Sequence, residues 1–230
     1  MPQHIGIVAC SAEGAALCYR TICMEGTQVL GTHQHPEVSL HTHPLAEYMK
    51  FVRGGDWAGV AELMRSSAEK LARAGADFLI CPDNTIHHAF EFVAHRSPRP
   101  WLHIVQEVAC EANRRQFKRL AVLGTRYTME GTVYPEKLQA AGLEFRVPAA
   151  AERQKIDQII MDELVNGQFL PRSRAYFTEV IRQLKDEGCD AVVLGCTEIP
   201  LIVSEESSPL PTLDSTRILA RAALRKAVKG

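Results

Sequence analysis

The chain has 230 residues, of which 46% are hydrophobic and 23% charged, ordinary proportions for a globular protein with room for two lobes. Its 26 basic and 27 acidic side chains give a formal charge of −1, so neither nucleic acid nor an anionic membrane is predicted as a partner. The longest apolar runs are too short to cross a bilayer and no signal peptide is evident, so we predict a cytoplasmic location.

Short β-rich apolar runs alternate along the chain with longer amphipathic stretches. In chain order, the predicted strands are Ile5–Ala9, Phe78–Cys81, Leu102–Val105, Leu120–Leu123, Leu143–Val147 and Ala191–Leu194. The predicted helices are Trp57–Ala74, Met129–Ala141, Lys155–Leu164, Arg174–Lys185 and Thr216–Val228. Three glycines lie just past helix ends, as C-caps do: Gly75, Gly142 and Gly188. This alternation predicts an α/β fold of the doubly wound type.

The chain also contains an internal repeat. Gly75–Ile80 matches Gly188–Val193, which places Asp83 and Cys196 in the same slot, 113 residues apart. The repeat predicts two pseudo-symmetric lobes, each with a mainly parallel sheet: residues 1–101 plus 208–230, and residues 102–207. Because ligands of open α/β sheets bind at the carboxyl ends of strands, we expect an active-site cleft between the lobes, with Asp83 facing Cys196 across it.

The motif Gly195–Ile199 (GCTEI) lies at one of these strand ends. It is the strongest of several matches by which the sequence, along nearly the whole chain, resembles the aspartate/glutamate racemase superfamily, and it is similar to the motif of the family's second catalytic cysteine. Asn84-Thr85 and His87 resemble the first-lobe motif, and Gly124-Thr125 and Leu213–Thr216 add weaker support. The resemblance implies a cofactor-independent isomerase acting on a small carboxylate. A homodimer is the default expectation for such an enzyme.

The chain departs from the family at the first catalytic cysteine, where Asp83 stands instead. Cys81 lies two residues earlier, and strand alternation makes it a poor substitute. Ordinary pKa values of about 3.9 for Asp and about 8.5 for Cys make the resting pair a carboxylate and a thiol. Reversing their protonation costs about 6 kcal/mol unless the surroundings tune both groups, so a one-directional reaction requires less tuning. We predict proton transfer between Asp83 and Cys196 on two faces of the substrate.

The resemblance also implies that hydroxyl and amide groups near this pair hold the substrate carboxylate. The candidates are Ser11, Asn84, Thr85, Thr125 and Thr197, with Arg126 for a second carboxylate and His43 for a polar specificity contact. Each has a plainer interpretation as a helix cap or surface residue, and Pro82–Thr85 also suits an Asx-type cap by Asp83. Val165–Gly167 lacks the lysine that some aspartate-specific members carry there, which argues against aspartate as the substrate.

Four histidines form two His-x-His pairs: His33, His35, His41 and His43. On a strand such a pair places both imidazoles on one face, which leaves a metal site open. Apart from Glu37 no ligand set is recognisable nearby, so no metal is predicted.

Two other functions remain open from the sequence. The first is a lyase resembling the superfamily's arylmalonate decarboxylases, which keep only the second-lobe cysteine, here Cys196. The second is a ligand-binding protein that has lost catalysis along with its first cysteine. Exchange of the substrate α-proton favours the racemase, release of CO₂ favours the lyase, and binding alone favours the third function.

Overall fold

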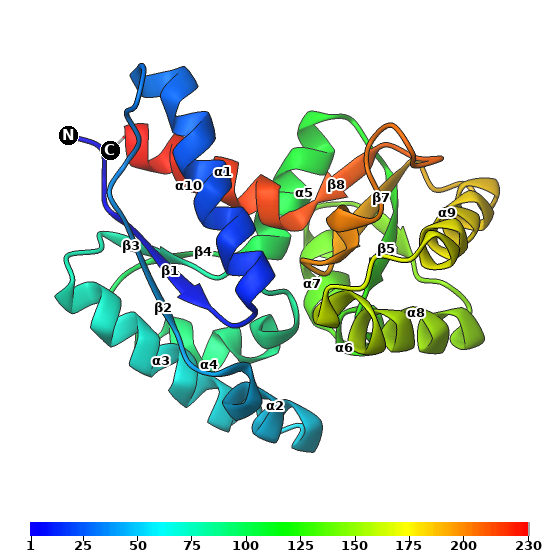
Figure 1. The fold of residues 1–230 in the computed structure, drawn as a ribbon, viewed down its shortest axis with the longest axis horizontal. Helices are drawn as coiled ribbons and strands as arrows, with labels where there is room; N and C mark the ends of the chain where they lie inside the picture. Colours follow the sequence, from blue (N-terminus) through cyan, green and yellow to red (C-terminus); the bar gives the residue numbers. More distant parts are fainter. Residues whose placement is uncertain (230) are drawn as a thin grey trace. The chain divides into compact units, whose positions relative to one another are not determined.

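A computed structural model describes residues 1–229, and these divide into two units (Figure 1). Unit 1 is Met1–Glu107 together with the chain from Thr216 onward, and unit 2 is Val108–Ser215. The predicted lobe boundaries after residues 101 and 207 lie six and eight residues before these positions. Within residues 1–229, no helix has both the length and the apolar character needed to span a membrane.

Unit 1 is built on four parallel strands in the order β2-β1-β3-β4. They are β1 (Ile5–Ala9), β2 (Val38–Thr42), β3 (Phe78–Ile80) and β4 (Trp101–Leu102). Its helices are α1 (Ala12–Leu30), α2 (Leu45–Gly54), α3 (Trp57–Arg73), η1 (Thr85–Ala89) and α4 (Phe90–Ala94), while α5 (Ile104–Arg114) and α10 (Ser215–Lys229) cross the unit boundaries. The strands β1 and β3 are buried throughout, which explains their unbroken apolar runs.

Unit 2 repeats this arrangement with the order β6-β5-β7-β8. Its strands are β5 (Arg119–Gly124), β6 (Glu144–Arg146), β7 (Ala191–Gly195) and β8 (Thr212–Asp214). Its helices are α6 (Arg126–Glu130), α7 (Val133–Ala140), α8 (Ala150–Asp162), η2 (Leu164–Asn166), α9 (Pro171–Asp186) and η3 (Ile199–Leu201). The predicted α/β class with two mainly parallel sheets is confirmed. The two sheets also have the same strand order.

The prediction of a strand over Leu102–Val105 is wrong. The strand β4 ends at Leu102 and the helix α5 begins at Ile104. Ile104 and Val105 are both fully buried, and a short buried apolar run does not distinguish a strand from the first turn of a buried helix. The predicted helix Met129–Ala141 is likewise interrupted between α6 and α7, at Gly131 and Thr132.

The predicted glycine C-caps are confirmed by their backbone angles. Gly75, Gly142 and Gly188 have φ angles of 99°, 71° and 92°, in the left-handed region that glycine adopts without steric cost. These three turns end α3, α7 and α9, and each leads toward the strand that follows.

Gly124 and Gly195 pair with each other at the carboxyl ends of β5 and β7. A Cβ atom on Gly195 would lie 2.7 Å from the Leu123 carbonyl oxygen, a contact that only a backbone shift relieves. We therefore expect Gly195→Ala to lower the free energy of unfolding by about 1–3 kcal/mol, measured by urea denaturation. Gly54→Ala is the control, because nothing lies within 4 Å of a Cβ there. Equal stability of Gly195→Ala and wild type would contradict this packing argument.

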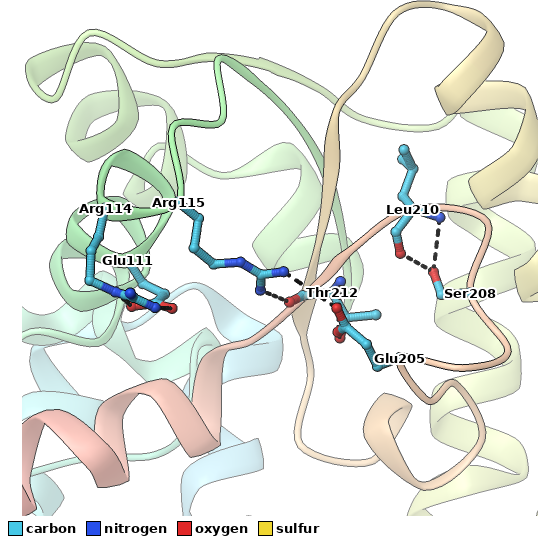
Figure 2. A network of polar contacts seen from close by, with 7 residues as sticks. All are labelled: Glu111, Arg114, Arg115, Glu205, Ser208, Leu210 and Thr212. Carbon is cyan, nitrogen blue, oxygen red and sulfur yellow. Dashed lines mark hydrogen bonds and ion pairs between the residues drawn. The ribbon is translucent and has the colours of Figure 1, made fainter.

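A polar network in unit 2 joins Arg115, directly after α5, to the start of β8 and to the segment before it (Figure 2). The Arg115 guanidinium donates to the Thr212 carbonyl oxygen at 2.9 Å and lies 3.3 Å from Glu205 Oε1. Glu205 also accepts hydrogen bonds from the Thr212 hydroxyl and from its backbone N–H, the latter at 3.1 Å. Burial acts to raise the pKa of Glu205, but the Thr212 hydrogen bonds and the Arg115 charge outweigh it and hold the pKa below its ordinary value.

This network makes a pH-dependent contribution to stability. Because the folded-state pKa of Glu205 is lowered, its contribution is complete above the unfolded value of about 4.3 and is lost as the pH falls through the folded value. We expect Glu205→Gln to cost at most about 1 kcal/mol at pH 7, since Glu205 is exposed and Arg115 partly exposed, and less below pH 4.3. Urea denaturation across this range, with exposed Glu136→Gln as control, measures it. A difference that grows toward acid pH would refute the network's role.

Candidate active site

Polar side chains follow the two central strands of unit 1 at their carboxyl ends. Ser11 follows β1 and caps α1, where its side chain accepts the Gly14 N–H at 3.3 Å. Asp83 follows β3, and its Oδ1 accepts the Ile86 N–H at 3.3 Å. Because β1 and β3 are paired neighbours, Ser11 and Asp83 lie at one edge of the sheet. Asp83 thus makes the Asx-type cap that the sequence left open, while its side chain is only half-buried.

His87 fixes the turn that carries Asp83. Its Nδ1 donates to the Asp83 carbonyl oxygen at 2.6 Å, and its Nε2 accepts the Ile104 N–H at 3.4 Å. The imidazole is buried and packs on the rings of Phe90 and His103, with centroids 5.5 and 4.7 Å away. Because both of its nitrogens are hydrogen-bonded within the fold, His87 positions the turn that carries Asp83.

Cys81 precedes Asp83 by two residues and is fully buried. Burial and then the negative charge of Asp83 raise the pKa of the Cys81 thiol well above its ordinary value, so it stays protonated. Reactive cysteines are partly exposed and have lowered pKa values, so Cys81 is a poor substitute for the missing catalytic cysteine. Tyr48 of α2 is equally buried, and its pKa is raised by burial and further by Cys10, Cys81 and Asp83.

The other predicted residues of unit 1 lie close by in the sheet topology. Asn84 is buried and Thr85 half-buried, and both lie at the start of η1, directly after Asp83. His43 follows the edge strand β2, next to β1, and its Nε2 lies 3.2 Å from Ser66 Oγ of α3. Burial, followed by the Lys70 charge, lowers the pKa of His43, which therefore carries no charge at neutral pH. Its role as a specificity contact stays a prediction.

Two of the remaining histidines of the His-x-His pairs, His35 and His41, bind neighbours within unit 1. His41 Nδ1 lies 3.0 Å from Ser67 Oγ, and its Nε2 accepts from Lys70 Nζ at 2.9 Å. His35 Nδ1 donates to the Pro36 carbonyl oxygen at 2.8 Å. Among residues 1–229, no group of three or more His, Cys, Asp or Glu side chains is arranged to hold a metal ion.

Unit 2 carries a matching pair of residues at the ends of its central strands. Thr125 follows β5 and caps α6, where its hydroxyl accepts the Thr128 N–H at 3.4 Å. Cys196 follows β7, and its carbonyl oxygen accepts the Ile199 N–H at 3.3 Å. Since β5 and β7 are paired, Thr125 and Cys196 occupy in unit 2 the places of Ser11 and Asp83 in unit 1.

Glu198 binds the side chains of the two residues that precede it. Cys196 Sγ donates to Glu198 Oε2 at 3.0 Å, and the Thr197 hydroxyl donates to the same oxygen at 2.6 Å. Glu198 is only 3% exposed. We did not single out this residue from the sequence, yet a usable signal is present: an acidic residue directly before the apolar run Ile199–Val203 is buried only when it is paired.

Arg126 is exposed at the start of α6. Its guanidinium lies over the Tyr127 ring at 4.8 Å and donates to the Tyr127 hydroxyl at 2.9 Å. That hydrogen bond raises the pKa of Arg126 above its ordinary value, so the side chain stays cationic. Its predicted contact with a second substrate carboxylate stays a prediction.

Two similar α/β units, each with acid/base or hydroxyl groups at the ends of its central strands, define a duplicated α/β protein. The family model for Asp/Glu/Hydantoin racemase matches residues 7–223. A broad specificity amino-acid racemase, RacX of Bacillus subtilis, is 24% identical over 188 residues, covering 82% of this chain and 80% of that protein. The chain therefore belongs to the Asp/Glu/Hydantoin racemase family, which confirms the resemblance and the predicted enzyme class, an isomerase.

Two solved structures are similar over nearly their whole length. A candidate Asp/Glu racemase from Yersinia pestis is 30% identical with a TM-score of 0.90, covering 98% of this chain and 99% of that one. An aspartate racemase homologue from Pyrococcus horikoshii is 27% identical with a TM-score of 0.85, covering 99% and 100% of the two chains.

Proposed function

We propose that the protein is a cofactor-independent amino-acid racemase or epimerase in which Asp83 and Cys196 are the two acid/base groups. The observation that carries this proposal is their equivalence: Asp83 comes three residues after the end of β3 and Cys196 directly after β7, and these are the corresponding central strands of the two units. The backbone N–H three residues on is bound in both turns, by the side-chain Oδ1 of Asp83 at Ile86 and by the backbone carbonyl oxygen of Cys196 at Ile199. Inversion at carbon needs one proton acceptor and one donor on opposite faces, and a duplicated fold supplies one group from each copy.

The proposed reaction begins with Asp83 as the base. Its carboxylate removes the α-proton, and the electron pair left on carbon delocalises into the substrate carboxylate to form an enediolate. The Cys196 thiol then gives its proton to the opposite face of that carbon. This leaves the other enantiomer, a protonated Asp83 and a Cys196 thiolate, with nothing oxidised or reduced.

The proposed substrate is an amino acid or a related small carboxylic acid. Hydroxyl, amide and backbone donors at the strand ends suit its carboxylate; they come from Ser11, Asn84, Thr85, Thr125 and Thr197. We assign the recognition of the substrate side chain to His43 and Arg126. The homodimer and the cytoplasmic location are part of the same proposal.

One feature favours a second candidate, a lyase that protonates an enediolate from one face. Cys196 is the only thiol of the equivalent pair, and Asp83 Oδ1 is already engaged as a cap by the Ile86 N–H. In such an enzyme Asp83 acts only on the leaving carboxylate or not at all.

Proton NMR in D₂O distinguishes the two candidates. The purified protein is incubated with a panel of D- and L-amino acids, 2-hydroxy acids and aryl-substituted malonates. Loss of the α-proton signal, with the opposite enantiomer appearing on a chiral column, is the result that we expect. Release of CO₂ with deuterium entering the product supports the lyase instead. Binding of a panel member without exchange or CO₂ release refutes both enzymes.

A further inference from the structure

The Cys196 thiol has a buried carboxylate as its hydrogen-bond partner. Sγ donates to Glu198 Oε2 at 3.0 Å, and the Thr197 hydroxyl reaches the same oxygen at 2.6 Å. An ionised carboxylate only accepts hydrogen bonds, so two donors on one oxygen suit the charged form of Glu198. A buried charge persists only with such partners, and Glu198 is 3% exposed. The two donors therefore fix both the carboxylate and the direction of the thiol.

This geometry favours the thiol over the thiolate. Ionisation of Cys196 would remove the hydrogen bond to Glu198 and place two negative charges about 3 Å apart, and both changes oppose it. The flanking strand ends bring other ionisable groups to this edge of the sheet. They are Arg126 and Tyr127 after β5 and Asp214 at the end of β8, while Tyr176 of α9 packs on the same core. Of these the cation, Arg126, is exposed and bound to Tyr127, so it does not replace the effect of Glu198.

We propose that Glu198 is a positioning residue that holds Cys196 as an oriented, protonated thiol, so that Cys196 is the acid and Asp83 the base of the resting protein. The assignment of acid and base rests on the proposed function, whereas the effect on the thiol does not. The assignment of Asp83 as the base predicts that the enzyme takes protons mainly from the enantiomer whose α-hydrogen faces Asp83. That enantiomer then exchanges its α-proton with retention of configuration faster than it is inverted, because inversion ends in the disfavoured Cys196 thiolate.

The test is the rate at which iodoacetamide alkylates Cys196, followed peptide by peptide with mass spectrometry from pH 6 to 10. Glu198→Gln removes the charge but keeps the shape, and we expect about tenfold faster alkylation at pH 7, equivalent to one pKa unit. Glu136→Gln, which removes a charge from the surface of α7, is the matched control and leaves the rate unchanged. Alkylation of Glu198→Gln at the wild-type rate or more slowly overturns the proposal.

Thr197→Val provides a test of opposite sign. It removes the hydroxyl that shares Glu198 Oε2, so the carboxylate opposes thiolate formation more strongly and alkylation becomes slower. This variant carries the test if circular dichroism shows that Glu198→Gln does not fold, and faster alkylation in Thr197→Val overturns the proposal. The assay needs no substrate. A shifted rate without α-proton exchange on any substrate would refute the proposed function and leave the effect on the thiol standing.

Discussion

Replacing Cys196 by serine is expected to lower kcat/KM for racemisation at least about a thousandfold, within the range by which one acid/base group accelerates proton transfer. A serine hydroxyl keeps the size of the thiol and its hydrogen bond to Glu198, but it is a far weaker acid than a thiol. The enediolate therefore lacks a proton donor on the face opposite Asp83. Chiral chromatography of product against time measures this loss.

A control for Cys196→Ser must remove a thiol without touching the site. Cys110→Ser meets this need, because Cys110 is exposed on α5, and we expect its activity to stay within about twofold of wild type. In the racemase, Cys196→Ser still allows Asp83 to exchange the α-proton of one enantiomer. If Cys196→Ser keeps a tenth or more of the wild-type racemisation rate, Cys196 is not the proton donor.

The central strands were predictable from the sequence because they are buried on both faces and therefore consist of continuous apolar runs. All five residues of β1 and of β7 are buried, and unbroken apolar runs mark both strands. The edge strands β2 and β8 were not predicted: every residue of β2 is at least partly exposed, and β8 has only three residues, of which Leu213 alone is buried, so neither forms an unbroken apolar run. The helix α1 was missed for another reason: its buried face consists largely of small residues such as Gly14, Ala15 and Gly26, which give a weak amphipathic pattern.

In the site, too, some features follow from the sequence pattern and others depend on the three-dimensional structure. The repeat identified Asp83 and Cys196 as equivalent, and the observed strand order of the two units agrees with that. From the sequence, Asp83 was either a helix cap or a catalytic base. The structure shows that one carboxylate oxygen is enough for the cap, so the two roles do not exclude each other. The role of Glu198 depends on side-chain rotamers that aim two donors at one oxygen, and residue spacing alone does not specify rotamers.

Asp83→Cys is expected to raise the ratio of inversion to retained exchange by more than tenfold. With aspartate opposite cysteine, ordinary pKa values differ by about 4.6 units, and the state reached after inversion lies about 6 kcal/mol above the resting state. Two thiols bring the two states to similar free energy. Deuterium entering the recovered substrate reports exchange, and deuterium in the opposite enantiomer reports inversion, so one NMR experiment with chiral separation gives both rates.

Asp83→Asn isolates the chemistry in the same experiment. Asparagine caps helices as well as aspartate does, so the contact with the Ile86 N–H survives while the base is lost. We expect Asp83→Asn to abolish exchange at nearly wild-type stability, whereas Asp83→Cys loses the cap, about 1 kcal/mol, and keeps a base. Cysteine therefore gives the less stable but more balanced enzyme, and asparagine the more stable but inactive one. Full activity in Asp83→Asn would show that the Asp83 side chain serves the fold alone, and the reaction would then depend on the Cys196 face as in the lyase.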